Sequence, residues 1–312
     1  MAYEETQRIA LGSVPFQCVF TSGSIWVTKY FANSVSRVDP VSNTILATVA
    51  VGEGPRDITV DEFGYIWVAC FGYNNGGLFR IDPETNLYDE SFLTTNGLEP
   101  RTVDFANGDI WVASQNNLIR VNPSTFVIDE PWPMGLGPDN DYTVHIADKV
   151  IGIDDSIWII DSGTDEVLKV DPVSLEIYTI ISLPVEGFVQ DVPGVYDFGY
   201  LWVVAGSAIH KIDTYNNLLV DTIPITARSY SVDSDGTYLW ITSDINDQLI
   251  RFEPYSSEIE IVSVADGDAP TYVIAENSSN IWYAASAASA LVNISRTGVV
   301  DWGDSTSVAI AF

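Results

Sequence analysis

The stretch GPRDITVDEFGYIWVACF, residues 54–71, contains the marks that decide the fold of this 312-residue chain. A turn that ends in proline comes first, an apolar run follows, and Trp67 stands between aliphatic residues. Tryptophans in the same setting occur at seven positions, 38 to 47 residues apart: Trp26, Trp67, Trp111, Trp158, Trp202, Trp240 and Trp282. A period of this length is typical of a propeller, in which each repeat forms one blade.

A second mark follows the tryptophan in the first six repeats, as in Arg80-Ile81-Asp82-Pro83. Its acidic or Asn residue comes 11 to 15 residues after the tryptophan. Proline cannot donate to a β-ladder and aspartate bonds back onto the turn backbone, so this pair ends a strand. The second repeat then predicts four short strands, which are Asp57–Val60, Tyr65–Cys70, Gly77–Ile81 and about Tyr88–Leu93.

The sequence therefore predicts an all-β fold, a seven-bladed β-propeller of four-stranded antiparallel blades that fills residues 1–312 as a single domain. Thr6–Gly12 aligns with the fourth strand of a blade, so the N-terminal strand is predicted to complete the seventh blade and close the ring. Thr306–Phe312 alternates like a strand, and it is expected either beside the N-terminal strand or over the edge of the blade.

The charge balance excludes two classes of partner. There are 13 Lys and Arg residues against 43 Asp and Glu residues, a net charge of −30, so neither nucleic acid nor an anionic membrane surface is expected to bind. The N-terminus lacks the pattern of a signal peptide, and no apolar run approaches 18 residues, so we expect a cytoplasmic or virion-incorporated protein without membrane insertion. Cys18 and Cys70 lie in apolar runs and are expected to be buried, reduced thiols.

The repeat carries a family resemblance. Segments such as Gly54–Val68 resemble blades of the virginiamycin B lyase-like, NHL and YncE-like propellers, and the resemblance covers essentially the whole chain. It implies a propeller fold, and for the lyase members it implies His and Glu residues with a divalent metal near the centre of one face. This sequence has only His145 and His210 and no paired His/Glu motif, so the lyase chemistry is not carried over, and both histidines are expected to be structural.

The residue after each proline turn is predicted at the mouth of the central channel. Read blade by blade, this position gives Phe16, Arg56, Arg101, Asp148 or Lys149, Asp191, Arg228 and Thr271. Three of the nine arginines fall here, and one hypothesis is that Arg56, Arg101 and Arg228 hold an anionic group or an acidic side chain of a partner. The alternative is that these arginines pair with local carboxylates such as Asp57 and Asp104.

The largest insert lies between the third and fourth tryptophans. It is interpreted either as a partner-contact loop or as a cover for a blade edge, and its candidate contact residues are Trp132, Met134, Asp139, Asp141 and Tyr142. Two acidic pairs resemble fragments of calcium loops without the full spacing, Asp139 with Asp141 and Asp233 with Asp235. No cofactor is expected apart from a divalent cation such as calcium at these pairs.

The sequence favours a non-catalytic scaffold that mediates protein–protein or receptor binding, as a structural component of a larger assembly such as a phage or virus particle, where it would act as a decoration, tail or receptor-binding protein. It has no nucleophile elbow, P-loop or zinc-ligand spacing, which argues against an enzyme. One alternative is a metal-dependent lyase or hydrolase of the virginiamycin B lyase-like type. Another is a carbohydrate-binding propeller that stacks glycans on Trp132 or Tyr73.

Overall fold

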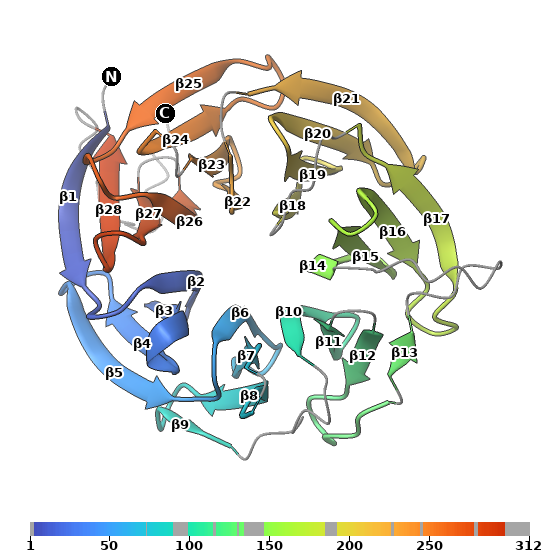
Figure 1. The fold of residues 1–312 in the computed structure, drawn as a ribbon, viewed down its shortest axis with the longest axis horizontal. Helices are drawn as coiled ribbons and strands as arrows, with labels where there is room; N and C mark the ends of the chain where they lie inside the picture. The colour runs from blue at the N-terminus through green and yellow to red at the C-terminus, as the bar shows by residue number, and fades with distance from the viewer. Residues whose placement is uncertain are drawn as a thin grey trace, which may run out of the picture.

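Seven four-stranded antiparallel sheets stand around a central axis in the computed structural model, which confirms the predicted propeller (Figure 1). The structure describes residues 3–72, 74–89, 99–114, 117–129, 131–133, 147–184, 192–225, 228–243, 246–277 and 280–296. The only helix among them is a three-residue 3-10 turn, Tyr30–Ala32, so no helix in this part of the chain could cross a membrane.

Each blade runs outward from the axis in chain order. Blades 1 to 3 contain β2 (Pro15–Thr21), β3 (Ser24–Lys29), β4 (Ser34–Asp39) and β5 (Thr44–Ala50); β6 (Pro55–Val60), β7 (Ile66–Cys70), β8 (Gly77–Asp82) and β9 (Leu87–Tyr88); and β10 (Pro100–Ala106), β11 (Asp109–Ser114), β12 (Asn117–Val121) and β13 (Trp132–Pro133). Blades 4 and 5 contain β14 (Ala147–Ile153), β15 (Ser156–Asp161), β16 (Glu166–Val170) and β17 (Ile177–Ser182); and β18 (Gly194–Asp197), β19 (Tyr200–Ala205), β20 (Ala208–Asp213) and β21 (Leu218–Pro224). Blades 6 and 7 contain β22 (Val232–Ser234), β23 (Leu239–Ser243), β24 (Gln248–Phe252) and β25 (Ile259–Ser263); and β26 (Pro270–Asn277), β27 (Asn280–Ala285) and β28 (Ala290–Arg296), which β1 (Tyr3–Ala10) completes.

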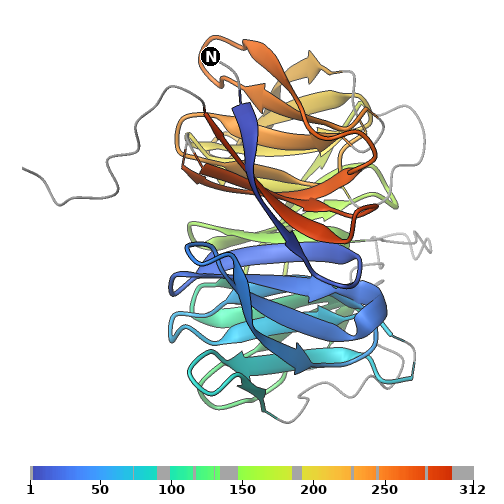
Figure 2. The same ribbon diagram turned by 90° about the vertical axis from the view of Figure 1, so that its left-hand side faces the viewer.

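The ring is closed by the N-terminal strand, as the sequence predicts. β1 pairs antiparallel with β28, from Tyr3 opposite Arg296 to Ala10 opposite Ala290, and Figure 2 shows the two strands side by side. Ile9 and Leu11 are buried between the seventh and first blades. The candidate C-terminal strand, Thr306–Phe312, lies outside the described residues.

The seven tryptophans occupy equivalent, buried places on the second strand of every blade. In the first six blades a basic residue of the third strand stands opposite the tryptophan, as Arg37 does for Trp26, and six of the thirteen Lys and Arg residues are placed in this way. The Arg37 guanidinium lies 5.3 Å from the centre of the Trp26 ring, and the Lys169 ammonium lies 5.1 Å from that of Trp158. These cation–π contacts explain why a basic residue precedes the Asp-Pro pair in the repeat.

The same basic side chains also connect neighbouring blades. Arg37 Nη1 donates to the Pro83 carbonyl of the second blade at 2.6 Å, and Arg120 Nη1 donates to the Pro172 carbonyl of the fourth blade at 2.9 Å. In the seventh blade Asn293 stands opposite Trp282 instead. There the closing strand supplies Arg8, whose Nη1 lies 2.8 Å from Asp268 Oδ1. The seventh blade therefore replaces the basic residue opposite its tryptophan with Asn293, and the arginine of its closing strand pairs with a carboxylate at the entry to β26.

The carboxylates of the repeat shape its turns. Asp39 Oδ1 accepts the Val41 amide at 2.8 Å in the turn that leads to the fourth strand, which confirms the predicted role of the Asp-Pro pair. Asp61 Oδ2 accepts Trp67 Nε1 at 2.8 Å, and Asp235 Oδ2 accepts Trp240 Nε1 at 2.8 Å. Carboxylates in the turns of the repeat thus accept hydrogen bonds from backbone amides and from tryptophan indoles.

Candidate functional site

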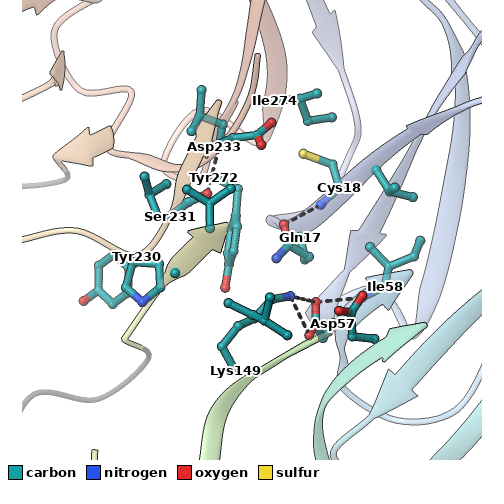
Figure 3. A pocket seen from close by; sticks show the side chains of 18 of the residues that line it. Gln17, Cys18, Asp57, Ile58, Lys149, Tyr230, Ser231, Asp233, Tyr272 and Ile274 are labelled. Atoms are coloured by element: carbon teal, nitrogen blue, oxygen red, sulfur yellow. Dashed lines mark hydrogen bonds and ion pairs between the residues drawn. The ribbon is translucent and has the colours of Figure 1, made fainter. Parts of the chain in front are cut away.

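The first strands of the blades surround a central cavity of about 650 Å³. Figure 3 shows side chains from several blades converging on it. Its charged lining residues are Arg56, Asp57, Arg101, Asp104, Asp148, Lys149 and Asp233. Charged side chains from four of the seven blades therefore meet in this channel.

A β-bulge at the start of the first strand sets the mouth of this channel. The register slips between Pro55 and Asp57, and the same slip recurs in the third, fourth and seventh blades. The extra residues at these bulges are Arg56, Arg101, Asp148 and Thr271. A bulge re-aims the side chain of its extra residue, and Arg56, Arg101 and Asp148 line the cavity.

Neighbouring side chains from five blades form an arc around the mouth. The Arg56 guanidinium lies 5.4 Å from the Phe16 ring centre and 5.6 Å from the Phe71 ring centre, and the Arg101 guanidinium lies 5.5 Å from Phe71. The Phe16 ring centre lies 5.2 Å from that of Tyr272. We call this set the mouth arc; its members are Tyr272, Phe16, Arg56, Phe71, Arg101 and Asp148.

The mouth arc places two like charges side by side. Arg101 Nη2 pairs with the fully buried Asp148 at 3.3 Å. Burial lowers the pKa of Arg101, and the nearby Arg56 lowers it further, whereas Asp148 and Glu99 raise it. Burial likewise raises the pKa of Asp148. The mouth therefore holds charged groups that water solvates poorly and that other polar groups must stabilise.

A second ion pair crosses the channel just inside the mouth. Lys149 of the fourth blade reaches past the third blade to Asp57 of the second, with Nζ 3.1 Å from Oδ2 (Figure 3). The Thr102 hydroxyl and the Val103 amide of the third blade also donate to Asp57 Oδ2, at 2.7 and 3.0 Å. Asp57 and Asp104 raise the pKa of Lys149 above its usual range despite its burial, so the side chain stays charged. This pair ties three blades together around one carboxylate.

Other acidic side chains of the channel also bond across blades. Asp104 Oδ2 accepts the Gly152 amide at 3.1 Å, and Asp233 Oδ2 accepts the Ala275 amide at 3.0 Å. Burial raises the pKa of both carboxyls, that of Asp233 to about 6. These residues join the first strands of neighbouring blades.

The channel carboxyl of Asp233 makes the stability of the fold depend on pH. Its pKa is about 6 in the folded protein against 3.8 for an ordinary Asp, so the folded state binds the extra proton between these values. Stability from this group is therefore highest at low pH and falls as the pH rises from about 4 to 6. Asp233→Asn should gain about 1–2 kcal/mol at pH 7.5, less than the full shift implies because one backbone amide loses its acceptor.

Urea unfolding at pH 4, 5, 6 and 7.5 measures this gain, which should vanish toward pH 4. Asp221→Asn, on the exposed face of β21, is the matched control and should show no such trend. A stability difference between Asp233→Asn and the wild type that stays the same from pH 4 to 7.5 would contradict the assignment.

The structure distributes the remaining sequence-predicted site residues over different places. The register of the sixth blade puts Tyr230 at the mouth, whereas Arg228 is exposed two residues earlier, 5.4 Å from the Tyr230 ring centre. The Thr271 hydroxyl donates to the Ala284 carbonyl within its own blade. Asp233 lies on the channel wall and Asp235 in a turn, so the structure does not bring this acidic pair to one point.

Most of the insert and one mouth residue fall outside the described part of the chain: Met134, Asp139, Asp141, Tyr142, Asp191, and also Tyr73 and His145. Trp132 is half-buried on β13 and packs against the fourth blade. His210 is buried, and its ring nitrogens lie 3.3 Å from Thr222 Oγ1 and the Ala205 carbonyl, which fits the structural role expected of it. Across the described ranges, no three His, Cys, Asp or Glu side chains are grouped to hold a metal ion.

A second surface, on the outer wall, was not predicted from the sequence. Seventeen of the twenty exposed large apolar side chains of the described residues lie on a fourth strand or on the connection leading to it. They are Val41, Ile45, Leu46, Leu87, Tyr88, Phe126, Val127, Ile128, Val173, Tyr178, Ile180, Tyr215, Leu218, Val220, Tyr255, Ile259 and Ile261. We call this set the outer belt. Figure 1 shows the fourth strands at the perimeter of blades 1 to 6.

The outer belt stops at the seventh blade. There the fourth strand is β1, whose exposed residues are polar or small, Glu4, Glu5, Thr6 and Ala10 among them. Four belt residues at turn tips are more than 80% exposed, and they are Val41, Val173, Tyr215 and Tyr255. The exposed large apolar side chains are thus gathered on the outer strands of six blades, where they alternate with exposed polar residues, rather than spread over the whole surface.

Fold and site together define a seven-bladed propeller whose channel mouth is bordered by arginine and aromatic side chains. Among solved structures it is similar to virginiamycin B lyase from Staphylococcus aureus, with a TM-score of 0.79 and 18% identity over 94% of this chain and 99% of the lyase chain. It is also similar to the Pan2 WD40 domain from Neurospora crassa, with a TM-score of 0.75 and 9% identity over 96% of both chains. The Cps50 (Swd1) β-propeller domain from Myceliophteria thermophila gives a TM-score of 0.72 and 11% identity over 95% of this chain and 100% of that one.

These neighbours confirm the resemblance to virginiamycin B lyase and other propellers at the level of the fold. No protein-family model matches the sequence, and no curated protein matches it significantly. The neighbours differ in function, from a lyase to WD40 domains, so the fold does not select an activity. The function must be argued from the mouth arc and the outer belt.

Proposed function

We propose that this chain is a non-catalytic binding propeller that docks onto other proteins within a larger assembly. The outer belt is the observation that carries the proposal. Covering exposed apolar side chains with a partner lowers the free energy of the system. Gathered exposed apolar side chains therefore often mark interaction sites. The belt follows six adjacent blades, so a partner could cover several blade edges at once.

The wider context supports binding rather than catalysis. Propellers that share this fold include a WD40 domain. In the described residues, the channel carboxylates of Asp57, Asp104 and Asp233 accept hydrogen bonds from neighbouring blades, which is a scaffold role. We propose, more specifically, that the assembly is a phage or virus particle and that the chain is its decoration, tail or receptor-binding component.

A triple variant of the belt tests the proposal. Val173→Ser, Tyr215→Ser and Tyr255→Ser lie on the turn tips of three adjacent blades, the fourth to the sixth. We expect the variant to fold normally, because exposed substitutions change stability little. We expect it to retain less than one-tenth of the protein partners that co-purify with the wild type from its native source, measured by quantitative mass spectrometry.

The matched control replaces exposed polar residues on the wall of the seventh blade, by Glu4→Ser and Thr6→Ser. This variant should keep the partners of the wild type. Recovery of the same partners, in the same amounts, by the triple belt variant would show that the belt is not the docking surface. The identity of the partners decides whether the assembly is a virus particle.

A further inference from the structure

We infer that the outer edge of the sixth blade accepts an extended segment of a partner protein, which pairs with β25 as a fifth strand and has apolar residues between basic ends. This inference rests on the proposed docking function, because it names the form and the chemistry of a segment that docks. It concerns one perimeter strand and the backbone groups along its open edge.

Six of the seven perimeter strands, as the structure describes them, are irregular or short. The register shifts in the ladders of β1, β5, β17 and β21, so each of these strands is interrupted by a bulge or a similar irregularity. The strands β9 and β13 have only two residues each. Bulges and very short edge strands hinder the addition of another strand to a sheet. The edges of these six blades are therefore poor templates for pairing.

The perimeter strand of the sixth blade, β25, forms a regular ladder with β24 that contains no register shift. Hydrogen bonds at both ends of this ladder show which residues are bonded. The Val264 amide donates to the Asp247 carbonyl, and the Glu253 amide donates to the Glu258 carbonyl. Every second residue of an antiparallel strand is bonded to its neighbour in this way. Residues 258, 260, 262 and 264 therefore direct their backbone groups toward β24.

The residues between them direct their amides and carbonyls away from β24, and they are Ile259, Ile261 and Ser263. β25 is the last strand of its sheet, so no strand of the described chain pairs with it on this side (Figure 1). The side chains of these three residues are exposed, and they lie on one face of the strand because side chains alternate. An extended segment can bond to such an edge through its backbone and pack its alternate side chains beside Ile259 and Ile261.

The charges around the edge favour a basic segment. Glu260, the only charged residue of β25, is paired with Arg251 on β24. The exposed Glu258 and Asp266 flank the strand at its two ends. A segment with Lys or Arg at both ends matches these carboxylates, whereas a second copy of this chain would bring the same carboxylates and a net charge of −30 to the edge.

Fluorescence anisotropy with a labelled peptide tests the inference. The probe is Lys-Val-Thr-Val-Thr-Val-Lys with capped ends, which has alternate apolar residues between two basic ones. Its control has glutamate in place of both lysines. The probe should bind the full chain saturably. The control should bind about ten-fold more weakly or less, because its ends would meet Glu258 and Asp266.

Two proline variants separate backbone pairing from apolar contact. Ile261→Pro and Ser263→Pro each remove one outward amide and leave the bonds to β24 in place, since an edge strand tolerates proline on its free side. Each should weaken probe binding about ten-fold or more, because a peptide carbonyl loses its donor. Ile261→Val is the matched control. It keeps the amide, is close to proline in size, and should weaken binding about three-fold or less.

Thermal unfolding shows whether each variant keeps the blade intact. If Ile261→Pro does not fold, Ser263→Pro at the end of the strand decides. Hydrogen exchange then locates the bound probe, which should slow exchange of the amides of Ile259, Ile261 and Ser263. Protection elsewhere on the chain, with none along β25, would contradict the site.

The other outcomes also decide. Absence of saturable binding by the lysine probe, wild-type affinity in the folded proline variants, or equal binding of the lysine and glutamate peptides overturns the inference. Dimers of the wild type that Ile261→Pro abolishes, measured by analytical ultracentrifugation, would make a second copy the occupant and overturn it as well. These results are independent of the belt variants, since retention of native partners by the triple belt variant overturns the proposed function without changing the peptide titrations.

Discussion

Deletion of residues 1–12 is expected to abolish the cooperative unfolding transition of the propeller. The deletion removes β1 and leaves the edge of β28 without its partner. It also removes Ile9 and Leu11 from the core between the seventh and first blades. Burial of two such side chains contributes about 3–6 kcal/mol, which is comparable to the whole net stability of many domains. Circular dichroism and calorimetry should show a broad transition or none.

A synthetic peptide of residues 1–12 is the control for this deletion. Added in excess, it should pair with β28 and restore the cooperative transition, because the closing strand contacts the blade only non-covalently. A shorter deletion of residues 1–2 should leave the transition unchanged. A deletion variant lacking residues 1–12 that unfolds with the midpoint and sharpness of the wild type would refute the role of β1 as the closing strand.

Asp57→Ala is expected to have the second largest effect, a loss of about 3–5 kcal/mol. The substitution leaves Lys149 without its ion-pair partner and removes the acceptor of the Thr102 hydroxyl and of the Val103 amide. Breaking a buried pair from one side is costly because the remaining charge stays desolvated. Lys149→Met should cost less, since Asp57 keeps its other donors.

A double-mutant cycle tests whether the two residues act as a pair. The Asp57→Ala/Lys149→Met variant should be less destabilised than the sum of the single variants, with a coupling of about 1 kcal/mol or more in urea unfolding. Glu5→Ala breaks the more exposed pair with Arg8 and should cost no more than about 1 kcal/mol. Strict additivity of the Asp57 and Lys149 effects would contradict a direct interaction.

The fold could be predicted from the sequence because the same pattern of residues recurs in every blade. Trp67 and its copies must be buried between blades, and the basic residue before Asp-Pro stands directly opposite in six of the seven blades. The pairing of β1 with β28 followed from the similarity of Thr6–Gly12 to other fourth strands. Local signals of this kind survive in a sequence because each blade contacts mainly its two neighbours.

The channel mouth could be predicted only in part. Arg56 and Arg101 were placed there because their proline turns are intact, and the structure brings both to the Phe71 ring. The turn before the sixth blade has no such proline, and counting residues then put Arg228 at the position that Tyr230 occupies. One residue of bulge or insertion changes which side chain faces the axis, and the sequence pattern does not show bulges.

The long-range contacts of the site left no signal in the sequence. Nothing near Lys149 indicates that its partner is Asp57, 92 residues earlier. The sequence around Tyr272 is that of an ordinary strand, although its ring packs against Phe16 from the far end of the chain. The outer belt was also missed, because an apolar residue in a strand is by default interpreted as buried.

The pairing of β1 with β28 has a consequence for how the protein is made. Of the described strands, β1 (residues 3–10) is synthesised before all the others, and its partner β28 (residues 290–296) is synthesised after all the others. At about 5–20 residues per second, synthesis of such a chain takes on the order of 15–60 seconds. During this interval the side chains of Ile9 and Leu11 have no seventh blade to pack against. Ring closure therefore has to follow synthesis of the last blade, and until then the open first blade is exposed to aggregation or to capture by chaperones.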